Sequence, residues 1–261
     1  MTNFFKFTNS IKKIFNIFNY KVEHVNSWYL RQENLISEMS EKETDIVKKI
    51  QPFTMCKTAN HWAIIQSLKH IKKNNIQGDL VECGVYKGGN IILYKKIIDQ
   101  ISIKKKIFAY DTFEGMAKPG EHDKDLKDVD ALETFKKYQS SKVRWCYSNI
   151  DEVKENITKF GINCENDFIF IKGKVEETLL EKKNLPEKIS LLRLDTDFYE
   201  STKIELEVLY PRLQPGGVLI IDDYGHWKGS KKAVDEYFDS KNNFYWFHRI
   251  DYASRLLIKK N

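Results

Sequence analysis

The chain has 261 residues, enough to bury one sizeable hydrophobic core, and nothing in it requires two full domains. Hydrophobic residues make up 41% and charged residues 31%, which is typical of a soluble enzyme. The net charge of +6 comes from scattered lysines rather than from an arginine-rich stripe, which argues against nucleic-acid binding. No apolar run reaches the roughly 18 residues that a membrane span needs. Four widely spaced cysteines indicate reduced thiols in a cytoplasmic setting.

Residues 1–76 form a predicted helical extension ahead of the main domain, which we assign to packing, to dimer formation or to a lid. Within residues 1–20, large apolar side chains recur at helical spacing with lysines between them. Such a basic amphipathic helix packs on its own domain or a second subunit, or it lies peripherally on a membrane surface. Both interpretations stay open. Further helices are predicted at about 32–50 and 59–74.

From residue 77 to residue 261, apolar runs of strand length alternate with helical segments. This alternation predicts a doubly wound α/β domain, with a mostly parallel sheet and helices on both faces. The last two strands should close the sheet as an antiparallel pair. The predicted strands are 79–83, 106–111, 167–172, 190–195, 217–222, 244–250 and 253–259. The predicted helices between them are 88–100, 200–212 and 230–240.

A long insertion, about 113–166, separates the second and third predicted strands. Its first part is densely charged between residues 121 and 130. A segment of this length beside the ligand-binding edge of a sheet is a candidate lid or substrate wall. The alternative is a pair of charged helices exposed to solvent.

Four aspartates follow two of the predicted strands. Asp195 and Asp197 come after one apolar run, and Asp222 and Asp223 come after another. Ligands of open α/β sheets bind at the carboxyl ends of parallel strands. Carboxylates held close together repel one another unless a cation or a shared proton neutralises them, and their oxygens suit a hard ion such as Mg²⁺ or Mn²⁺. The alternative role for each aspartate is to cap the helix that follows it.

A glycine turn follows the first predicted strand, within the segment 78–89. Its spacing, E-x-G-x-x-x-G-G, differs from the G-x-G-x-x-G of dinucleotide-binding enzymes. The second strand ends in Asp111, and an acidic residue at that position usually binds ribose hydroxyls in doubly wound folds. An adenosine-bearing cofactor without a pyrophosphate fits both features, and S-adenosylmethionine is the obvious candidate.

With these motifs in place, the chain resembles the macrocin O-methyltransferase family, whose members methylate sugar hydroxyls with S-adenosylmethionine and a divalent metal. The matching stretches are GDLVECGVYKGG (78–89), YDTFEGM (110–116), VKENITKFGI (153–162), KGKVEETL (172–179), LLRLDTDFYEST (191–202), LYPRLQPGG (209–217), IDDYGHWKGSKKAVDEYF (221–238) and RIDYASR (249–255). The resemblance covers about residues 78–256 and implies a class I methyltransferase fold with a seven-stranded sheet. The chain departs from the family at Thr196, where relatives often have glycine.

The resemblance also implies a role for each matching residue. Asp195, Asp222 and Asp223 match the metal ligands, with Asp195 and Asp197 as the catalytic pair and Asp197 as general base. The candidate cofactor contacts are Glu82, Gly84, Tyr86, Gly88, Gly89, Asp111, Thr112 and Phe113. The candidate substrate contacts are His226, Tyr224 and Arg255.

The sequence therefore predicts an S-adenosylmethionine-dependent, divalent-metal-assisted O-methyltransferase acting on a sugar hydroxyl. The acceptor sugar belongs to a nucleotide-sugar, a polysaccharide or a glycosylated natural product. We expect a homodimer or higher oligomer, cytoplasmic and in contact with the inner membrane face if residues 1–20 bind lipid. The alternatives are a catechol-type O-methyltransferase and a non-catalytic S-adenosylmethionine-binding partner protein. A nicotinamide-dependent dehydrogenase fits poorly, since its glycine motif is missing.

Overall fold

The computed structural model describes residues 36–141, 144–240 and 245–260. The chain divides into two compact units, Met1–Glu38 and Met39–Asn261. The second unit holds the sheet and also the helices Glu41–Ile50 and Thr58–Lys73, which the sequence analysis assigns to the N-terminal extension. The predicted amphipathic helix of residues 1–20 lies outside the described residues.

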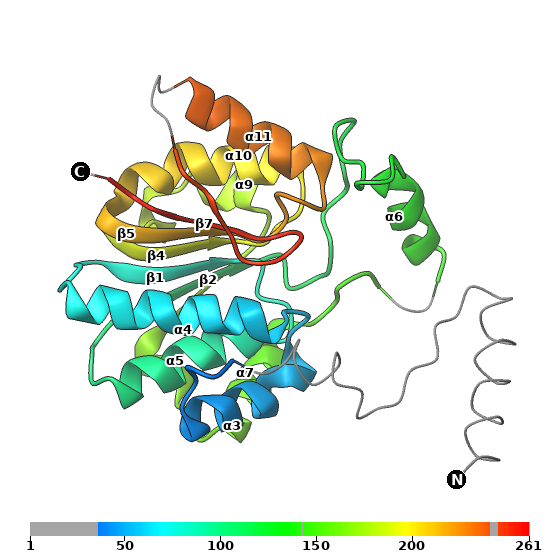
Figure 1. The fold of residues 1–261 in the computed structure, drawn as a ribbon. Coiled ribbons are helices and arrows are strands. Elements are labelled where there is room, and N and C mark those ends of the chain that lie inside the picture. Colours follow the sequence, from blue (N-terminus) through cyan, green and yellow to red (C-terminus); the bar gives the residue numbers. More distant parts are fainter. Residues whose placement is uncertain (1–35, 142–143, 241–244, 261) are drawn as a thin grey trace, which may run out of the picture. The chain divides into compact units, whose positions relative to one another are not determined.

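A seven-stranded sheet forms the centre of the second unit (Figure 1), in the order β3-β2-β1-β4-β5-β7-β6. β1 to β5 run parallel, β7 is antiparallel to β5, and β6 is antiparallel to β7. The order places β1 and β4 side by side at the point where the chain reverses its direction across the sheet. The strands are β1 (Asp79–Cys83), β2 (Ile107–Asp111), β3 (Phe168–Lys172), β4 (Ile189–Leu194), β5 (Leu213–Ile221), β6 (His248–Arg249) and β7 (Arg255–Ile258).

Helices cover both faces of the sheet, as Figure 1 shows. One face packs against α3 (Glu41–Ile50), α4 (Thr58–Lys73), α5 (Gly89–Gln100) and α7 (Ile150–Lys159). The other packs against α9 (Val175–Thr178), α10 (Tyr199–Val208) and α11 (Lys228–Asp239). The remaining short elements are η1 (Gln51–Phe53), α6 (Ala131–Gln139), α8 (Cys164–Asp167), η2 (Lys182–Asn184) and η3 (Tyr210–Arg212).

The central strands are apolar because both of their faces are covered. On β4, Leu191 packs toward the first group of helices, whereas Ile189 and Leu192 pack toward the second. Every residue of β4 is buried, which is the pattern expected of a central parallel strand. Arg193 is the one charged residue of β4, and it too is fully buried.

Two predicted helices differ at their boundaries. The helix predicted at about 32–50 begins in the structure only at Glu41, because Ser40 and Glu43 form a reciprocal capping box at its N-terminus. The helix predicted over 200–212 ends at Val208, and the short helix η3, which contains Pro211, follows it. Pro211 cannot continue α10, because it has no N–H to donate to the carbonyl four residues earlier.

Between β2 and β3, where the sequence analysis places an insertion of about 113–166, the chain forms α6, α7 and α8. Val153 and Ile157 of α7 are fully buried in the core against the sheet, so α7 is part of the domain framework. What remains is the stretch 113–149, which carries α6. Its segment 120–131 is attached to the domain at the start of α11. Asp125 forms a β-bridge with Trp227, and the Lys124 carbonyl accepts the Lys228 N–H.

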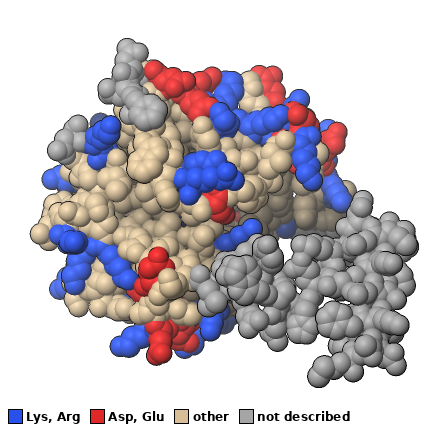
Figure 2. Space-filling model, viewed as in Figure 1, with Lys and Arg blue, Asp and Glu red and all other residues tan. Residues whose placement is uncertain are grey.

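Basic and acidic side chains are interspersed over the face of the molecule that Figure 2 shows, with no single field of one sign. Within the described residues, no helix combines the length and the apolar character that crossing a membrane requires. All four cysteines are unbridged.

Candidate active site

The four predicted aspartates converge at the carboxyl ends of β4 and β5. Backbone hydrogen bonds continue the sheet into both aspartate loops: the Asp195 N–H donates to the Cys83 carbonyl at 2.8 Å and the Asp222 N–H to the Leu194 carbonyl at 2.9 Å. Carboxylate oxygens of Asp195, Asp197 and Asp223 lie within 4.8 Å of one another. Asp197 has a left-handed backbone with φ of 70°, a conformation that costs energy in non-glycine residues and is found at functional sites.

Arg193 lies directly beneath this cluster and joins its carboxylates. Its guanidinium contacts Asp195 Oδ2 at 2.8 Å, Asp222 Oδ1 at 2.7 Å and Glu82 Oε1 at 2.6 Å. The guanidinium also donates to Cys56 Sγ at 3.0 Å. A planar fork with several donors suits this task better than a lysine ammonium would. Arg193 therefore holds the ends of β1, β4 and β5 together through their charged side chains.

The arrangement sets the protonation of the cluster. Burial raises the pKa of Asp195 and of Asp223 well above the usual range, and the neighbouring carboxylates raise both further. Burial also raises the pKa of Asp197, to about 7. Asp222 differs: burial alone would raise its pKa, but the Arg193 charge and hydrogen bonds from Arg193 and Ser254 lower it below the usual value. The cluster thus contains one firmly ionised carboxylate and three that lack full charge compensation.

A cleft of about 350 Å³ opens over the cluster, and we call it the acidic cleft. All four aspartates line it. Its other walls are the segment 54–57 with Asn60, the glycine turn at 84–86, Trp145 with Cys146, and the loops 226–227 and 251–254. Ser254 couples two of these walls to the cluster, because its hydroxyl accepts from Asn60 at 2.7 Å and donates to Asp222 at 3.0 Å.

A second, smaller cavity, which we call the β2-side cavity, lies beside the acidic cleft. It is lined by Asp111, Thr112, the 115–117 and 173–176 segments, Thr196 and Ser201. Gly84 and Asp195 line both cavities, so the two meet at the end of β1 and β4. The Asp111 carboxylate is held in place by three backbone N–H groups, those of Val85 at 2.6 Å, Tyr86 at 3.1 Å and Phe113 at 2.7 Å.

The structure brings some of the predicted cofactor contacts to these cavities and places others elsewhere. Gly84, Tyr86, Asp111 and Thr112 line one or both of them. Glu82 does not: it is fully buried, where Arg193, Asn90 and Tyr94 donate to its carboxylate. Burial of an acid among three donors is the reason that it serves the core and not the cavity wall.

Three more of the predicted cofactor contacts pack against the protein. A side chain at Gly88, which precedes α5 and has φ of 90°, would meet Val153, and one at Gly89 would meet the Phe53 carbonyl at 2.7 Å. Phe113 is buried against Phe170, with ring centroids 6.2 Å apart. These residues close the space around the helix and the sheet, and none of the three lines either cavity.

Of the predicted substrate contacts, His226 lines the acidic cleft, and its Nδ1 lies 3.3 Å from the Tyr252 hydroxyl. Tyr224 instead donates to Asp235 of α11 at 2.7 Å, and the Arg255 guanidinium lies over the Tyr224 ring. These two are not among the residues that line the cleft. The side chain of Thr196, where the chain departs from the family, donates to Glu205 at 3.0 Å.

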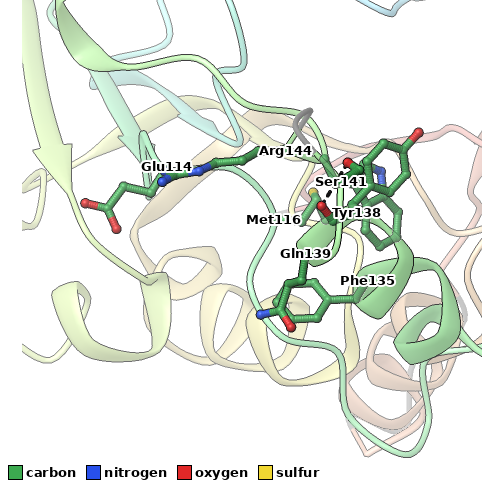
Figure 3. A pocket seen from close by; sticks show the side chains of 8 residues that line it. Glu114, Met116, Phe135, Tyr138, Gln139, Ser141 and Arg144 are labelled. Carbon is green, nitrogen blue, oxygen red and sulfur yellow. Dashed lines mark hydrogen bonds between the residues drawn. The ribbon is translucent and has the colours of Figure 1, made fainter.

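Another pocket, of about 310 Å³, lies beside α6 (Figure 3). Phe135, Tyr138 and Gln139 of α6 line it together with Met116 and Trp145, while the Glu114 carboxylate extends away from the others. Tyr138 stacks on Trp145 with ring centroids 5.8 Å apart. Trp145 lines both this pocket and the acidic cleft.

Sequence analysis missed several residues that shape the site. Arg193 carried a visible signal, since a charged residue inside an otherwise apolar strand must have buried partners. Asn60, Ser254 and Tyr252 carried none, because their partners lie far away along the chain.

Parallel strands in the order 3-2-1-4-5, followed by an antiparallel β7, a glycine turn after β1 and an acidic residue ending β2, together define the class I methyltransferase fold. The solved structure of the O-methyltransferase NovP shares this fold, with a TM-score of 0.70 and 25% identity over 89% of this chain and 94% of that one. The model of the macrocin O-methyltransferase family matches residues 8–257. The chain belongs to that family.

Two curated relatives illustrate the family. Demethyldecarbamoylnovobiocin O-methyltransferase of Streptomyces niveus is 31% identical over 67% of this chain and 63% of its own length. A rhamnosyl-tetracenomycin C 4'-O-methyltransferase of Streptomyces olivaceus is 32% identical over 63% of this chain and 59% of its own. The match thus spans about three-fifths of the length of each relative.

Proposed function

We propose that the protein is an S-adenosylmethionine-dependent O-methyltransferase that methylates a sugar hydroxyl of a glycosylated natural product, a nucleotide-sugar or a polysaccharide. The family and the names of the relatives support this reaction class. The observation that carries the proposal is that Gly84 and Asp195 line both cavities. A donor held in the β2-side cavity and an acceptor held in the acidic cleft would therefore meet beside the carboxylate cluster.

In the proposed reaction, the acceptor hydroxyl oxygen attacks the sulfonium methyl group. A carbon–oxygen bond forms as the carbon–sulfur bond breaks, neutral S-adenosylhomocysteine leaves, and the hydroxyl proton passes to a carboxylate of the protein. The chain's main task is alignment, because holding two reactants in attack geometry can supply roughly 7–11 kcal/mol. Asp111 would hold the donor's ribose, and His226 with Tyr252 would orient the acceptor at the mouth of the cleft.

The residues present fit a divalent cation. Asp223 Oδ2 is buried and has no hydrogen-bond partner, and burial together with neighbouring carboxylates raises the pKa of both Asp195 and Asp223. A cation would relieve both conditions. We assign Asp195, Asp222 and Asp223 as ligands of Mg²⁺ or Mn²⁺, because Arg193 keeps Asp222 ionised and ready to bind. When bound, the cation would supply a Lewis acid for the acceptor hydroxyl.

Asp197 is assigned as the general base. Its carboxylate lines the same cleft, and its pKa of about 7 is suited to accepting a proton near neutrality. A competing assignment has support in the geometry, since Asp197 and not Asp222 shares the 4.8 Å cluster with Asp195 and Asp223. Asp197 would then be the third metal ligand. The Asp197→Asn variant described below distinguishes the two roles.

The testing experiment is calorimetric titration with S-adenosylmethionine and separately with Mg²⁺, followed by measurement of S-adenosylhomocysteine formation on a panel of glycosides. We expect cofactor binding, a Mg²⁺ isotherm that is lost in Asp222→Ala, and turnover on at least one glycoside that EDTA abolishes. Absence of cofactor binding would contradict the methyltransferase proposal. Turnover that EDTA leaves unchanged would contradict the metal alone. The homodimer, the cytoplasmic location and the membrane contact through residues 1–20 remain predictions.

A further inference from the structure

Asp123, from the stretch between β2 and α7, is the buried residue that connects this stretch to the two aspartate loops. Only 1% of its surface is exposed. Its Oδ1 accepts the Tyr199 N–H at 2.8 Å, and its Oδ2 accepts the Gly120 N–H at 2.7 Å. Tyr199 is the first residue of α10, and Phe198, the residue before it, provides no side-chain cap. Asp123 therefore caps α10 from a distant part of the chain.

The same carboxylate also lies against the first turn of α11. A Cβ atom built on Gly229 would fall 2.0 Å from Asp123 Oδ1, so that glycine leaves the space that the carboxylate occupies. α11, like α10, has no side-chain cap of its own. Next to Asp123, the Lys124 carbonyl accepts the Lys228 N–H at 2.8 Å. One short segment thus holds the N-terminal turns of both helices.

These two helices begin where the two aspartate loops end. α10 follows Asp197 by two residues, and α11 begins five residues after Asp223. The same junction is packed by aromatic rings: Phe198 and Trp227 have centroids 5.6 Å apart, and Trp145 lies 6.1 Å from each. The distance between the loops therefore depends on contacts that Asp123 and its neighbours make, and not on the sheet alone.

We propose that Asp123 is a positioning residue that sets the separation of the Asp197 and Asp223 carboxylates by joining the first turns of α10 and α11. This inference rests on the proposed metal site. Without the Asp123 carboxylate, the Tyr199 N–H loses its acceptor and the two loops separate. The Asp197 and Asp223 carboxylates are then too far apart to bind one cation as tightly. The cost falls on metal affinity, because outer contacts of metal sites typically change affinity about 10–100-fold.

The test measures Mn²⁺ binding to the full chain by the loss of the free-ion electron paramagnetic resonance signal. Asp123→Ala should weaken Mn²⁺ binding by about tenfold or more. Asp123→Asn should recover most of that loss, since its amide oxygen can still accept the Tyr199 N–H. Asp128→Asn is the matched control: it lies in the same segment and pairs with Lys228 of α11, but it is exposed and should bind Mn²⁺ as the wild type does.

Gly229→Ala provides a second route if Asp123→Ala does not fold. Its methyl group would displace the Asp123 carboxylate without removing it, and Mn²⁺ binding should weaken in the same direction. Affinity for S-adenosylmethionine, measured by calorimetry, should change less than about threefold in the folded variants, because Asp123 lines neither cavity. Wild-type Mn²⁺ affinity in both Asp123→Ala and Gly229→Ala would overturn the role of Asp123. A wild-type protein that binds no Mn²⁺ would contradict the proposed metal site itself.

Discussion

At the scale of single residues, Arg193 is the buried cation that pairs with the acidic cluster. It is fully buried and pairs with carboxylates that belong to three neighbouring strand ends. Such a buried cation contributes little net stability over an apolar equivalent of the same shape. Removing the cation alone, however, leaves its carboxylate partners without a counter-charge. Its role is therefore to make a dense acidic cluster compatible with a folded sheet.

The first prediction concerns this residue. Replacing Arg193 with Leu should lower the free energy of unfolding by about 3–5 kcal/mol, because Glu82 would remain fully buried, and Asp222 half-buried, without a counter-charge. Urea unfolding followed by circular dichroism measures the change. Lys228→Ala, which removes an exposed pair with Asp128, should cost less than about 1 kcal/mol. Equal losses in the two variants would mean that Asp195, Asp222 and Glu82 do not depend on Arg193.

The second prediction separates the two assignments of Asp197. If Asp197 is the general base, Asp197→Asn should bind S-adenosylmethionine and Mg²⁺ as the wild type does, while turnover falls by about 10²–10⁴-fold. Calorimetry measures the two affinities, and S-adenosylhomocysteine release measures turnover. Loss of Mg²⁺ binding in this variant would identify Asp197 as a ligand instead. Unchanged turnover would remove it from the mechanism.

At the scale of elements, α3 shows how a helix outside the sheet is attached to the domain. Ser40 and Glu43 cap its N-terminus, and Val47 and Ile50 bury its apolar face in the core. Glu43 is itself 1% exposed and contacts Lys69 of α4 at 2.6 Å. Burial alone would raise the pKa of Glu43, but the hydrogen bonds from Lys69 and Ser40 and the Lys69 charge lower it overall.

A pH dependence follows, and it is our third prediction. Because the pKa of Glu43 is lower in the folded state, its contribution is present above the unfolded pKa of about 4.5 and is lost as the pH falls through the folded value. Glu43→Gln keeps the capping geometry and removes the charge, so it should cost about 1 kcal/mol at pH 7 and little near pH 3. Urea unfolding at both pH values measures this. Glu41→Gln, exposed in the same turn, is the control. A pH-independent loss in Glu43→Gln would contradict the ion-pair explanation.

At the scale of the whole molecule, the sheet order places the two cavities side by side. β1 and β4 are neighbours although more than a hundred residues separate them, and their ends supply Gly84 and Asp195 to both cavities. A Cβ at Gly84 would fall 2.0 Å from the Asp195 carbonyl oxygen, so the close approach of the two loops requires glycine there. Ligand binding between these loops should therefore stabilise the domain as a unit.

The fourth prediction measures that stabilisation. S-adenosylmethionine at a hundred times its dissociation constant should add about 2.7 kcal/mol and raise the Tm by about 5–10 °C in a thermal-shift assay. In Asp111→Ala the ligand-dependent increase, measured from that variant's own Tm, should largely disappear at the same concentration. An undiminished increase would show that Asp111 holds the glycine turn without contributing to donor binding.

Apolar patterning along the chain was sufficient to predict the five parallel strands and most of the helices that flank the sheet. Of the strand predicted over 244–250, only His248–Arg249 is a strand among the described residues. The runs ending at Leu194 and Ile221 are buried strands, and the four aspartates after them do meet at one edge. Placement within the site was less predictable. Glu82 points into the core because Tyr94 and Asn90 lie above it on α5, a relation that depends on how that helix crosses the strand.

The sequence by itself determined the fold class and the edge of the sheet that carries the carboxylates, because local periodicity and strand-end position depend on neighbours along the chain. Its motifs carried the resemblance to the family. Only the tertiary structure decided which carboxylates share a cluster, that Arg193 takes Asp222 as a partner, and that Asp123 joins two helix termini. Those relations depend on distances of a few ångströms between segments that are remote in sequence, and no local pattern encodes such distances.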